Sequence, residues 1–598
     1  MSINEAYVND RGEDRNVHFA KHDNGNELVG PHHFEMQHNT LDKMQKTKEE
    51  DELLKEESRN FIAVGLQRFW TEWDCFVVNH RSFIKGFSLL IVIVAIILYI
   101  AAVIYQFLKQ DEAIEWCQGY GLAFIVLFIF VYGFSYYLVI QPYILPSFSG
   151  VFHSKPVVVT WRKIRPVLAV VLIAVFGAFL IWDTSGERRR LVSIAGLIMF
   201  ILLGFIFSKH PTRVKWRTVF MGILIQFLVG LFAIRWSVGR QIFRCIGIQT
   251  EHFLEYAYVG ASFVYGDLLV KKEAVFAFEA LSAIFFVSMI VQVLFYLGWM
   301  QVICLKLGWF MQFMLGTTVM ESVNAVSSVF LGMTEAPLLY KPYIKDLTRS
   351  EMHAVMAGGF STIAGTVFAA FTSFGVEPSN IITASIMTAP AALCYAKLVY
   401  PESVKSKTDS KTVRIYESED KSVMDAVIQG AFVGIGMVQG IIATIIACVS
   451  FVACFNDFLA WLGLLAGVPD FTLETIFSYL LYPVVWMMGV EPSQCLTVSR
   501  LIGIKITVNE FVAYVKLGEI KKTGAISPRT EAIATFALCS FANPGSLGIL
   551  ISTLTTLCPS QRFNILAVAI RAFISAIVIS FLTACIAGAL MPENGFSA

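Results

Sequence analysis

The sequence has little charge for its length. Only 15% of its 598 residues are Asp, Glu, Lys or Arg, whereas soluble domains carry about 25%. The formal net charge is +1, so electrostatics give no reason to expect a nucleic-acid partner. Apolar residues make up 56% of the chain, and 50 residues are Phe. This balance excludes an ordinary soluble protein and indicates one that crosses a membrane several times.

Signatures of catalysis and metal binding are also missing. The sequence contains no Walker A motif, no HExxH and no GxSxG, so nucleotide hydrolysis, zinc-protease chemistry and serine-hydrolase chemistry are not indicated. The 11 cysteines are scattered and include no CxxC pair, and we expect neither a disulfide framework nor a zinc site. Histidine is nearly absent from the apolar stretches, with His353 at the edge of one. An integral membrane enzyme therefore stays only as an alternative.

Charge is concentrated at the amino-terminal end. Residues 1–60 hold 22 charged side chains and five of the ten histidines. We expect residues 1–82 to form a cytoplasmic, largely disordered tail, because they lack both a core to bury and the apolar segment of a signal peptide. Residues 591–598 follow the last apolar stretch, and we expect them to form a short extracellular tail.

Eleven apolar stretches are long enough to cross a bilayer, which takes about 20 residues. The predicted spans are 84–107, 118–141, 165–182, 189–208, 217–235, 274–298, 353–374, 380–398, 425–454, 530–556 and 564–590. The links after the second and fourth spans are rich in Lys and Arg, which places the N-terminus in the cytoplasm and the C-terminus outside. Arg188, Arg189 and Arg190 break this rule, because they fall on the outer side.

Two further apolar stretches, near 311–340 and 493–515, are interrupted by carboxylates and other polar groups. The first contains Glu335, and the second contains Lys505 and Glu510. An ionised side chain at bilayer depth costs about 2.5–3.5 kcal/mol, and irregular backbone is tolerated there only inside protein or beside a cavity. We predict two re-entrant hairpins around a polar site. Interfacial helices, or a structural ion pair between Lys505 and Glu510, are the alternative.

Each predicted hairpin is followed by a span with a polar break. The first break lies within 358–371, and the second lies within 537–550, where Asn543, Pro544 and Gly545 interrupt the helix. Such breaks leave free carbonyls and half-helix ends. Two units of this kind in corresponding positions are typical of transporters built from repeats. We therefore assign 216–590 to a transporter core and 83–215 to additional membrane helices.

Four motifs in this core resemble the signature blocks of the concentrative nucleoside transporter family. They are GMTEAPLL (332–339), GFSTIAG (359–365), NEFVAY (509–514) and FANPGSLG (541–548). The resemblance implies an all-α polytopic fold of two inverted repeats, with about eleven transmembrane helices and two re-entrant hairpins. It also implies a homotrimer, an elevator-like movement, and import of nucleosides across the plasma membrane, coupled to a cation gradient.

The resemblance also implies a substrate site. The residues expected to face the nucleobase are Met333, Thr334, Glu335 and Val367, and those expected to bind the ribose or pack on the ligand are Glu510, Asn543, Ser546 and Phe541. A mostly apolar pocket with a few polar groups suits a neutral nucleoside, whereas a nucleotide would call for an arginine cluster. A transporter or channel for another small polar solute is the alternative.

Four positions resemble the purine-preferring members of the family. They are Gly332, Met333, Thr366 and Val367. The pattern of the pyrimidine-preferring members has Ser, Gln, Ser and Leu at these four positions, in that order. Met333 offers a flexible apolar surface to a larger base, and Val367 leaves more room than Leu for a second ring. We therefore expect purine nucleosides and uridine to be favoured.

The resemblance implies a site for the coupling cation at Ser328, Leu331, Thr362 and Ile363. Sodium-driven members carry Asn at the position of Ser328, and a hydroxyl is a shorter-reaching ligand than an amide carbonyl. Two interpretations stay open: a weaker sodium site, or proton coupling with Glu335 as the carrier. We expect no prosthetic group.

Overall fold

The computed structural model describes residues 186–404, 406–407, 418–469 and 471–592, with shorter stretches between 65 and 135 and at 183–184. The chain divides into two units, Met1–Ala113 and Ile114–Ala598. In the first unit, the apolar helix Leu98–Phe107 lies within the first predicted span. The predicted span at 165–182, most of the N-terminal tail and most of the C-terminal tail lie outside the described residues.

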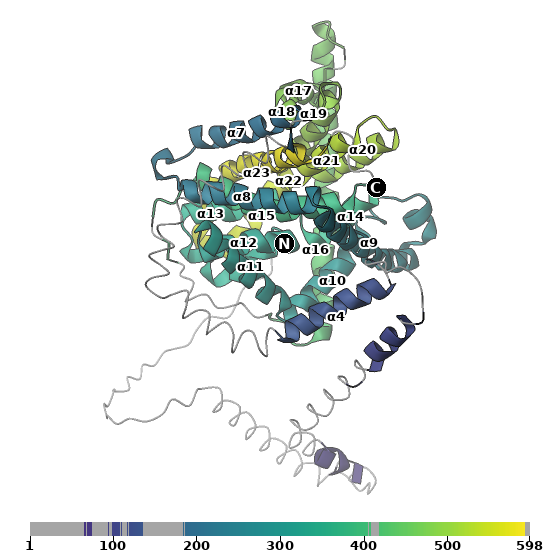
Figure 1. The fold of residues 1–598 in the computed structure, drawn as a ribbon. Helices are drawn as coiled ribbons and strands as arrows, with labels where there is room; N and C mark the ends of the chain where they lie inside the picture. The colour runs from purple at the N-terminus through teal and green to yellow at the C-terminus, as the bar shows by residue number, and fades with distance from the viewer. Residues whose placement is uncertain are drawn as a thin grey trace, which may run out of the picture. The chain divides into compact units, whose positions relative to one another are not determined.

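The regular structure in the described part of the second unit consists of helices, which run in several directions (Figure 1). They are α4 (Gly119–Ser135), α7 (Arg190–Ile206), α8 (Trp216–Gly230), α9 (Ser237–Tyr265), α10 (Ser282–Tyr296), α11 (Trp299–Leu315), α12 (Val319–Phe330), α13 (Arg349–Ser361), α14 (Phe368–Ser373), α15 (Pro378–Val399), α16 (Val423–Leu465), α17 (Leu473–Leu480), α18 (Tyr482–Met487), α19 (Pro492–Thr507), α20 (Glu510–Lys522), α21 (Pro528–Leu538), α22 (Pro544–Leu557) and α23 (Arg562–Leu590).

Four described helical segments are long and apolar enough to cross a membrane: Trp216–Arg235, Pro378–Val399, Val423–Leu465 and Pro559–Leu590. A fifth candidate joins α10 and α11, which meet at an angle of 78°. The bend lies at Gly298, whose φ of 77° favours glycine. The predicted span at 274–298 therefore starts too early, because α10 begins only at Ser282. It also ends too early, because the candidate span continues beyond the bend into α11.

Both predicted hairpins are present, with shifted boundaries. The first consists of α12 and a 3₁₀ segment, Ala336–Asp346, and it begins at Val319 rather than near 311, because α11 continues to Leu315. The second consists of α19 and α20 and continues to Lys522 rather than 515. Asn509 ends the first arm and caps the second, where its side chain accepts from the Val512 amide at 3.0 Å.

A broken helix follows each hairpin, as predicted. Helix α13 ends at Ser361, extended backbone follows at Thr362, and the chain resumes through the short turn Gly365–Val367 into α14. Helix α21 ends at Leu538, and α22 begins at Pro544. A long apolar helix follows each broken helix: α15 follows the first, and α23 follows the second. The order of hairpin, broken helix and long helix thus occurs twice.

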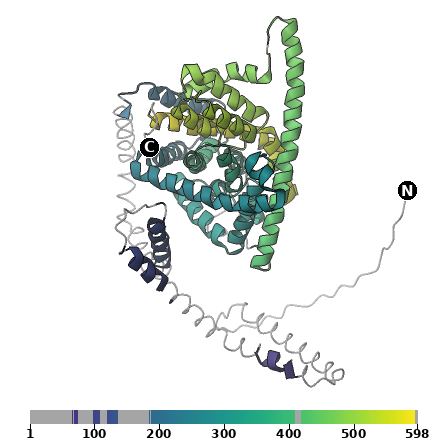
Figure 2. The same ribbon diagram turned by 90° about the vertical axis from the view of Figure 1, so that its right-hand side faces the viewer.

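The longest helix, α16, runs along one side of the unit (Figure 2). Its glycines allow close packing on α10: a Cβ at Gly430 would lie 2.7 Å from the Met289 Cα, and one at Gly434 would lie 3.1 Å from the Phe285 Cα. Small residues of this kind are how helices approach closely in membranes. Helix α16 therefore packs backbone to backbone against α10.

Arg190, which broke the charge rule of the sequence, is a buried structural group. Its side chain pairs with Asp183, and its Nε donates to the Ala589 carbonyl at the end of α23 at 2.8 Å. The residue is only 1% exposed. Because this charge is paired and hydrogen-bonded inside the protein, it does not indicate on which side of the membrane the segment lies.

The structure contains one disulfide among its described residues that the sequence analysis did not predict. Cys117 and Cys245 form a disulfide that joins the segment before α4 to α9. Gln249, one turn further along α9, also donates to the Cys117 carbonyl oxygen. The two cysteines are 128 residues apart, and no local spacing pattern signals such a pair.

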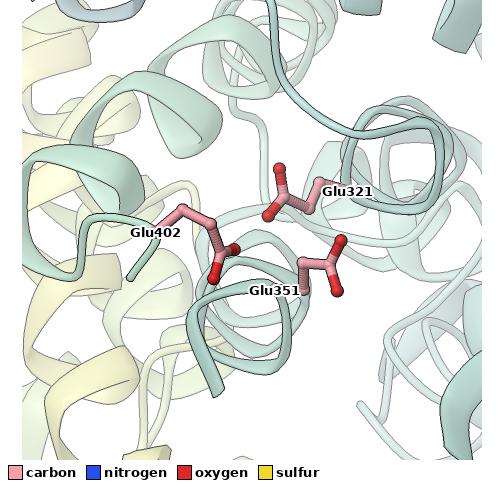
Figure 3. Close-up of side chains that lie close together, drawn as sticks. All are labelled: Glu321, Glu351 and Glu402. Carbon is pink, nitrogen blue, oxygen red and sulfur yellow. The ribbon is translucent and has the colours of Figure 1, made fainter. Parts of the chain in front are cut away.

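Three carboxylates converge where the first hairpin meets α13 and α15 (Figure 3). Carboxylate oxygens of Glu321, Glu351 and Glu402 lie within 4.8 Å of one another. Lys397, at the end of α15, forms ion pairs with Glu321 and with Glu402, the latter at 3.3 Å. The side chain of Glu321 is fully buried and that of Lys397 is 11% exposed. The lysine therefore holds the base of the first hairpin against its neighbours.

We predict that Lys397→Met lowers stability strongly, because it leaves Glu321 buried without a cation. Loss of one member of a buried pair costs about 3–5 kcal/mol. The double variant Glu321→Gln/Lys397→Met should recover part of this loss. The measurement is thermal unfolding of the purified protein in detergent. Lys271→Met is the matched control, because Lys271 pairs with Asp267 on the surface. Equal melting of Lys397→Met and Lys271→Met would refute the assignment.

Candidate binding site

The second hairpin and the second broken helix meet at a buried polar pair. Asn543 caps α22, and its Oδ1 accepts from the Ser546 amide at 2.8 Å. This hydrogen bond fixes the side chain, and its Nδ2 donates to the Glu510 Oε2 at 2.7 Å. Both residues are at most 3% exposed. An acceptor and an amide are thus held side by side where the helix is interrupted.

The sequence around the break explains its shape. Pro544 occupies the first turn of α22, where its missing N–H costs nothing. Phe541, 7% exposed, lies in the unwound segment between α21 and the cap. Glu510, Asn543 and Ser546, which are expected to bind the ribose, therefore lie with Phe541, which is expected to pack on the ligand, at one junction of α20 and α22.

The tip of the first hairpin is a tight turn at Gly332–Glu335. The Glu335 Oε2 accepts from the Gly332 amide at 3.1 Å, and the Glu335 amide donates to the Gly332 carbonyl at 3.1 Å. Met333 is 9% exposed and lies against α13. A Cβ at Gly359 would lie 3.3 Å from the Met333 Cβ and 3.5 Å from the Leu550 Cδ2. The first hairpin tip, α13 and α22 therefore meet at Gly359.

Thr366 and Val367 lie in the turn of the first broken helix and are buried. The Thr366 hydroxyl has no hydrogen-bond partner among the described residues. A Cβ at Gly365 would lie 2.8 Å from the Phe330 carbonyl oxygen, so only glycine allows the end of α12 to rest on this turn. The site thus has two halves, which we call half-sites. The first consists of the hairpin tip at Gly332–Glu335 and the turn Gly365–Val367, and the second consists of Glu510 and residues 541–546. Each half-site is built from the end of a hairpin and the break of a helix.

The four positions expected to bind a cation lie at the ends of α12 and α13. Ser328 and Leu331 belong to the end of α12, and Thr362 and Ile363 follow α13. Ser328 is 1% exposed, and its hydroxyl has no hydrogen-bond partner in the described part of the chain. In transporters with discontinuous membrane helices, oxygen atoms at a half-helix end, such as freed carbonyls, bind alkali cations. The residues present fit a monovalent cation.

Sequence reasoning missed a hydrogen-bonded clamp inside the first hairpin. The Asn324 Nδ2 donates to the Val355 carbonyl at 3.0 Å, and the Tyr340 hydroxyl donates to the Asn324 Oδ1 at 2.6 Å. Asn324 thus joins both arms of the hairpin to α13. The sequence held one sign of this role: Asn324 lies one helical turn before Ser328, on the same face of α12.

It also missed the contribution of α16. A Cβ at Gly332 would lie 3.6 Å from the Met437 Cε, and one at Gly545 would lie 2.2 Å from the Thr444 Cγ2. One helix therefore touches both half-sites. Its sequence is mostly apolar, and nothing in it marks Met437 or Thr444 for this role.

Three family models match the chain in order. The model described as Na+ dependent nucleoside transporter N-terminus matches residues 195–268. The model described as nucleoside recognition, or Gate, matches 277–378. The model described as Na+ dependent nucleoside transporter C-terminus matches 380–588.

Curated relatives and solved structures agree with these matches. Sodium/nucleoside cotransporter 2 of Rattus norvegicus is 42% identical over 427 residues, which are 69% of this chain and 64% of that protein. Sodium/nucleoside cotransporter 1 of Oryctolagus cuniculus is 42% identical over 72% of this chain and 68% of its own length. Solute carrier family 28 member 3 of Homo sapiens is 45% identical over 72% and 64%. The chain thus spans less than two thirds of the length of two of these relatives and slightly more than two thirds of the third.

Among solved structures, CNTnw in an inward-facing substrate-bound state is 33% identical, with a TM-score of 0.64, over 68% of this chain and 98% of its own. A doubly substituted CNTnw in an outward-facing state is 34% identical, with a TM-score of 0.65, over 68% and 99%.

Two hairpins and two broken helices around a buried polar site define a secondary transporter of the repeat type. The matches specify which one: this chain belongs to the sodium-dependent, concentrative nucleoside transporter family. The resemblance and the all-α repeat fold expected from the sequence are confirmed. Because the relatives are named as cotransporters, the alternative of a membrane enzyme is set aside.

We predict that Glu510→Gln reduces nucleoside uptake by about 10- to 100-fold, because a hydrogen bond to a charged group contributes about 1.5–3 kcal/mol. A 2′- or 3′-deoxynucleoside that lacks the partner hydroxyl should lose less. Uptake of radiolabelled nucleosides in transporter-deficient cells measures both. Glu519→Gln, on the exposed face of α20, is the control. Normal uptake by Glu510→Gln at normal surface expression would exclude a ribose role.

Proposed function

We propose that this chain is a cation-coupled symporter that imports nucleosides across the plasma membrane. The observation that carries the proposal is the buried Asn543–Glu510 pair, with 2.7 Å between its nitrogen and oxygen. A carboxylate accepts hydrogen bonds from two neighbouring ribose hydroxyls, and an amide beside it both donates and accepts. The apolar side chains of Met333, Val367 and Phe541 offer surfaces to a flat base. These groups suit a neutral nucleoside better than another small polar solute.

Alternating access by an elevator-like movement fits the division of the helices. The hairpins, the broken helices, α15 and α23 form the moving part, and α10 with α16 forms the support on which it slides. Solved CNTnw chains are titled as inward-facing, intermediate and outward-facing, which supports a movement of this kind. We propose a homotrimer in the membrane, with the N-terminus in the cytoplasm and the C-terminus outside.

The proposed substrate preference is for purine nucleosides and uridine. Gly332 leaves the first hairpin tip without a side chain, and an added Cβ would lie 3.4 Å from the Ala364 Cβ and 3.6 Å from the Met437 Cε. Met333 and Val367 leave an apolar space without an amide that would favour a pyrimidine edge. Thr366 lies beside Val367 and is fully buried.

Competition assays test this preference. Adenosine, inosine, guanosine and uridine should inhibit labelled uptake better than cytidine and thymidine. Met333→Gln should shift the order toward pyrimidines, because it restores an amide at the hairpin tip. Cytidine as the best inhibitor of the parent protein would contradict the preference, even if uptake itself is confirmed.

We propose sodium as the coupling cation, bound by Ser328, Leu331, Thr362 and Ile363. The unpaired, buried hydroxyl of Ser328 supports this assignment, since a buried polar atom without a partner is costly. A proton on Glu335 is the second candidate. It is favoured by the position of this carboxylate at the hairpin tip, beside the proposed base contacts.

Uptake in sodium-free buffer at pH 5.5 and 7.5 distinguishes the two ions. Sodium coupling predicts that uptake is lost at both pH values without sodium. Proton coupling predicts sodium-independent uptake that rises on acidification. Ser328→Asn should lower the sodium concentration needed for half-maximal uptake, because an amide carbonyl reaches further than a hydroxyl. An unchanged sodium curve for Ser328→Asn would remove Ser328 from the site.

A further inference from the structure

The two hairpins place different residues at one corresponding position. Helix α12 ends at the cap residue Leu331, and helix α19 ends at the cap residue Val508. Three residues before the cap, the first hairpin carries Ser328 and the second carries Lys505. Counted from the end of the helix, the serine and the lysine are counterparts in the two repeats.

Each of these positions belongs to a unit whose broken helix ends inside the protein. Helix α13 ends before Thr362, and α21 ends before Cys539. The last carbonyls of a helix have no partner within it and carry its negative end. At membrane depth no bulk water satisfies them. A positive charge at each end is the simplest way to stabilise both breaks.

In the second repeat, the chain supplies this charge itself. Lys505 is fully buried. Its Nζ donates to the Ala537 carbonyl oxygen, in the last turn of α21, at 2.8 Å, and to the Ser580 Oγ on α23 at 3.2 Å. A lysine ammonium is a compact point charge, and both of its hydrogen-bond partners here are oxygens. Glu510 is paired with Asn543 instead.

In the first repeat, the corresponding side chain is too short to do this. Ser328 is buried, its hydroxyl lacks a partner among the described residues, and it adds an oxygen where Lys505 adds a charge. We propose that Lys505 is a tethered cation that permanently fills, in the second repeat, the position that the coupling cation fills in the first. Lys505 is then a positioning residue: it holds α19 on α21, so that Glu510 and Asn543 keep their register. The proposal rests on the cation site of the proposed function.

Replacement of Lys505 tests the proposal through its cation dependence. Lys505→Ser reproduces the first repeat, so its melting temperature and uptake should be lowered at low sodium and recover as sodium rises. Its sodium curve should be steeper than that of the parent. Lys505→Met offers no oxygen and should lose at least about 10-fold in uptake without recovery. Lys516→Ser, on the exposed side of α20, is the control. A Lys505→Ser protein with the sodium curve and melting temperature of the parent would overturn the proposal.

The reciprocal variant keeps the proposal testable if the Lys505 variants do not fold at any sodium concentration. Ser328→Lys should place an ammonium in the first repeat and make nucleoside binding independent of sodium. Retained sodium dependence of binding in Ser328→Lys would count against the correspondence of the two positions. Failure of the cation site itself is a separate result: parent uptake would then be independent of sodium, whereas cation-dependent melting of Lys505→Ser, measured with Na+, K+ and Li+, would still report on Lys505.

Discussion

The rest of the structure depends on one constraint: a helix that breaks inside a membrane protein must find new partners for the backbone groups that the break frees. Each unsatisfied group costs several kcal/mol in a medium without water. In the described part of the chain, broken helices follow both hairpins, with the breaks after Ser361 and after Leu538. At the second break, Lys505 donates to the Ala537 carbonyl and Asn543 accepts from the Ser546 amide, so both side chains satisfy freed backbone groups. The proposed binding uses the same backbone groups. A ligand hydroxyl or a cation can bond to the N–H and C=O groups that have lost their partners within the helix.

The scarce basic residues of the core are used in the same way. Arg529 is 5% exposed and donates to the carbonyls of Gly489 and Gly588, both at 2.7 Å. Arg190 donates to the neighbouring Ala589 carbonyl. The carboxyl end of α23 is therefore held by two guanidinium groups from distant parts of the chain. Positive side chains at helix carboxyl ends are favourable, and Arg190 and Arg529 stabilise the end of α23 in this way.

Local sequence predicted those parts of the fold that local chemistry determines. Glycine, proline and capping residues marked both breaks, and the carboxylates within apolar stretches marked both hairpins. The family motifs assigned Glu510 and Asn543, 33 residues apart, to one site, but they did not predict the hydrogen bond between the two side chains. The α10–α11 bend, the Cys117–Cys245 pair and the contacts of α16 with the site were not predicted. Each depends on which distant surface a residue meets, and the mostly apolar sequence of α16 does not single out the residues that touch the site.

The bond between Cys117 and Cys245 changes what counts as one molecule. It closes a covalent ring through α4, α7 and α8. A single protease cut anywhere within the ring opens it without releasing either piece. The nicked protein would migrate as one species on a gel without reductant and as two with it. Biochemists who map exposed segments of this transporter by limited proteolysis will therefore see cuts in this region only after reduction.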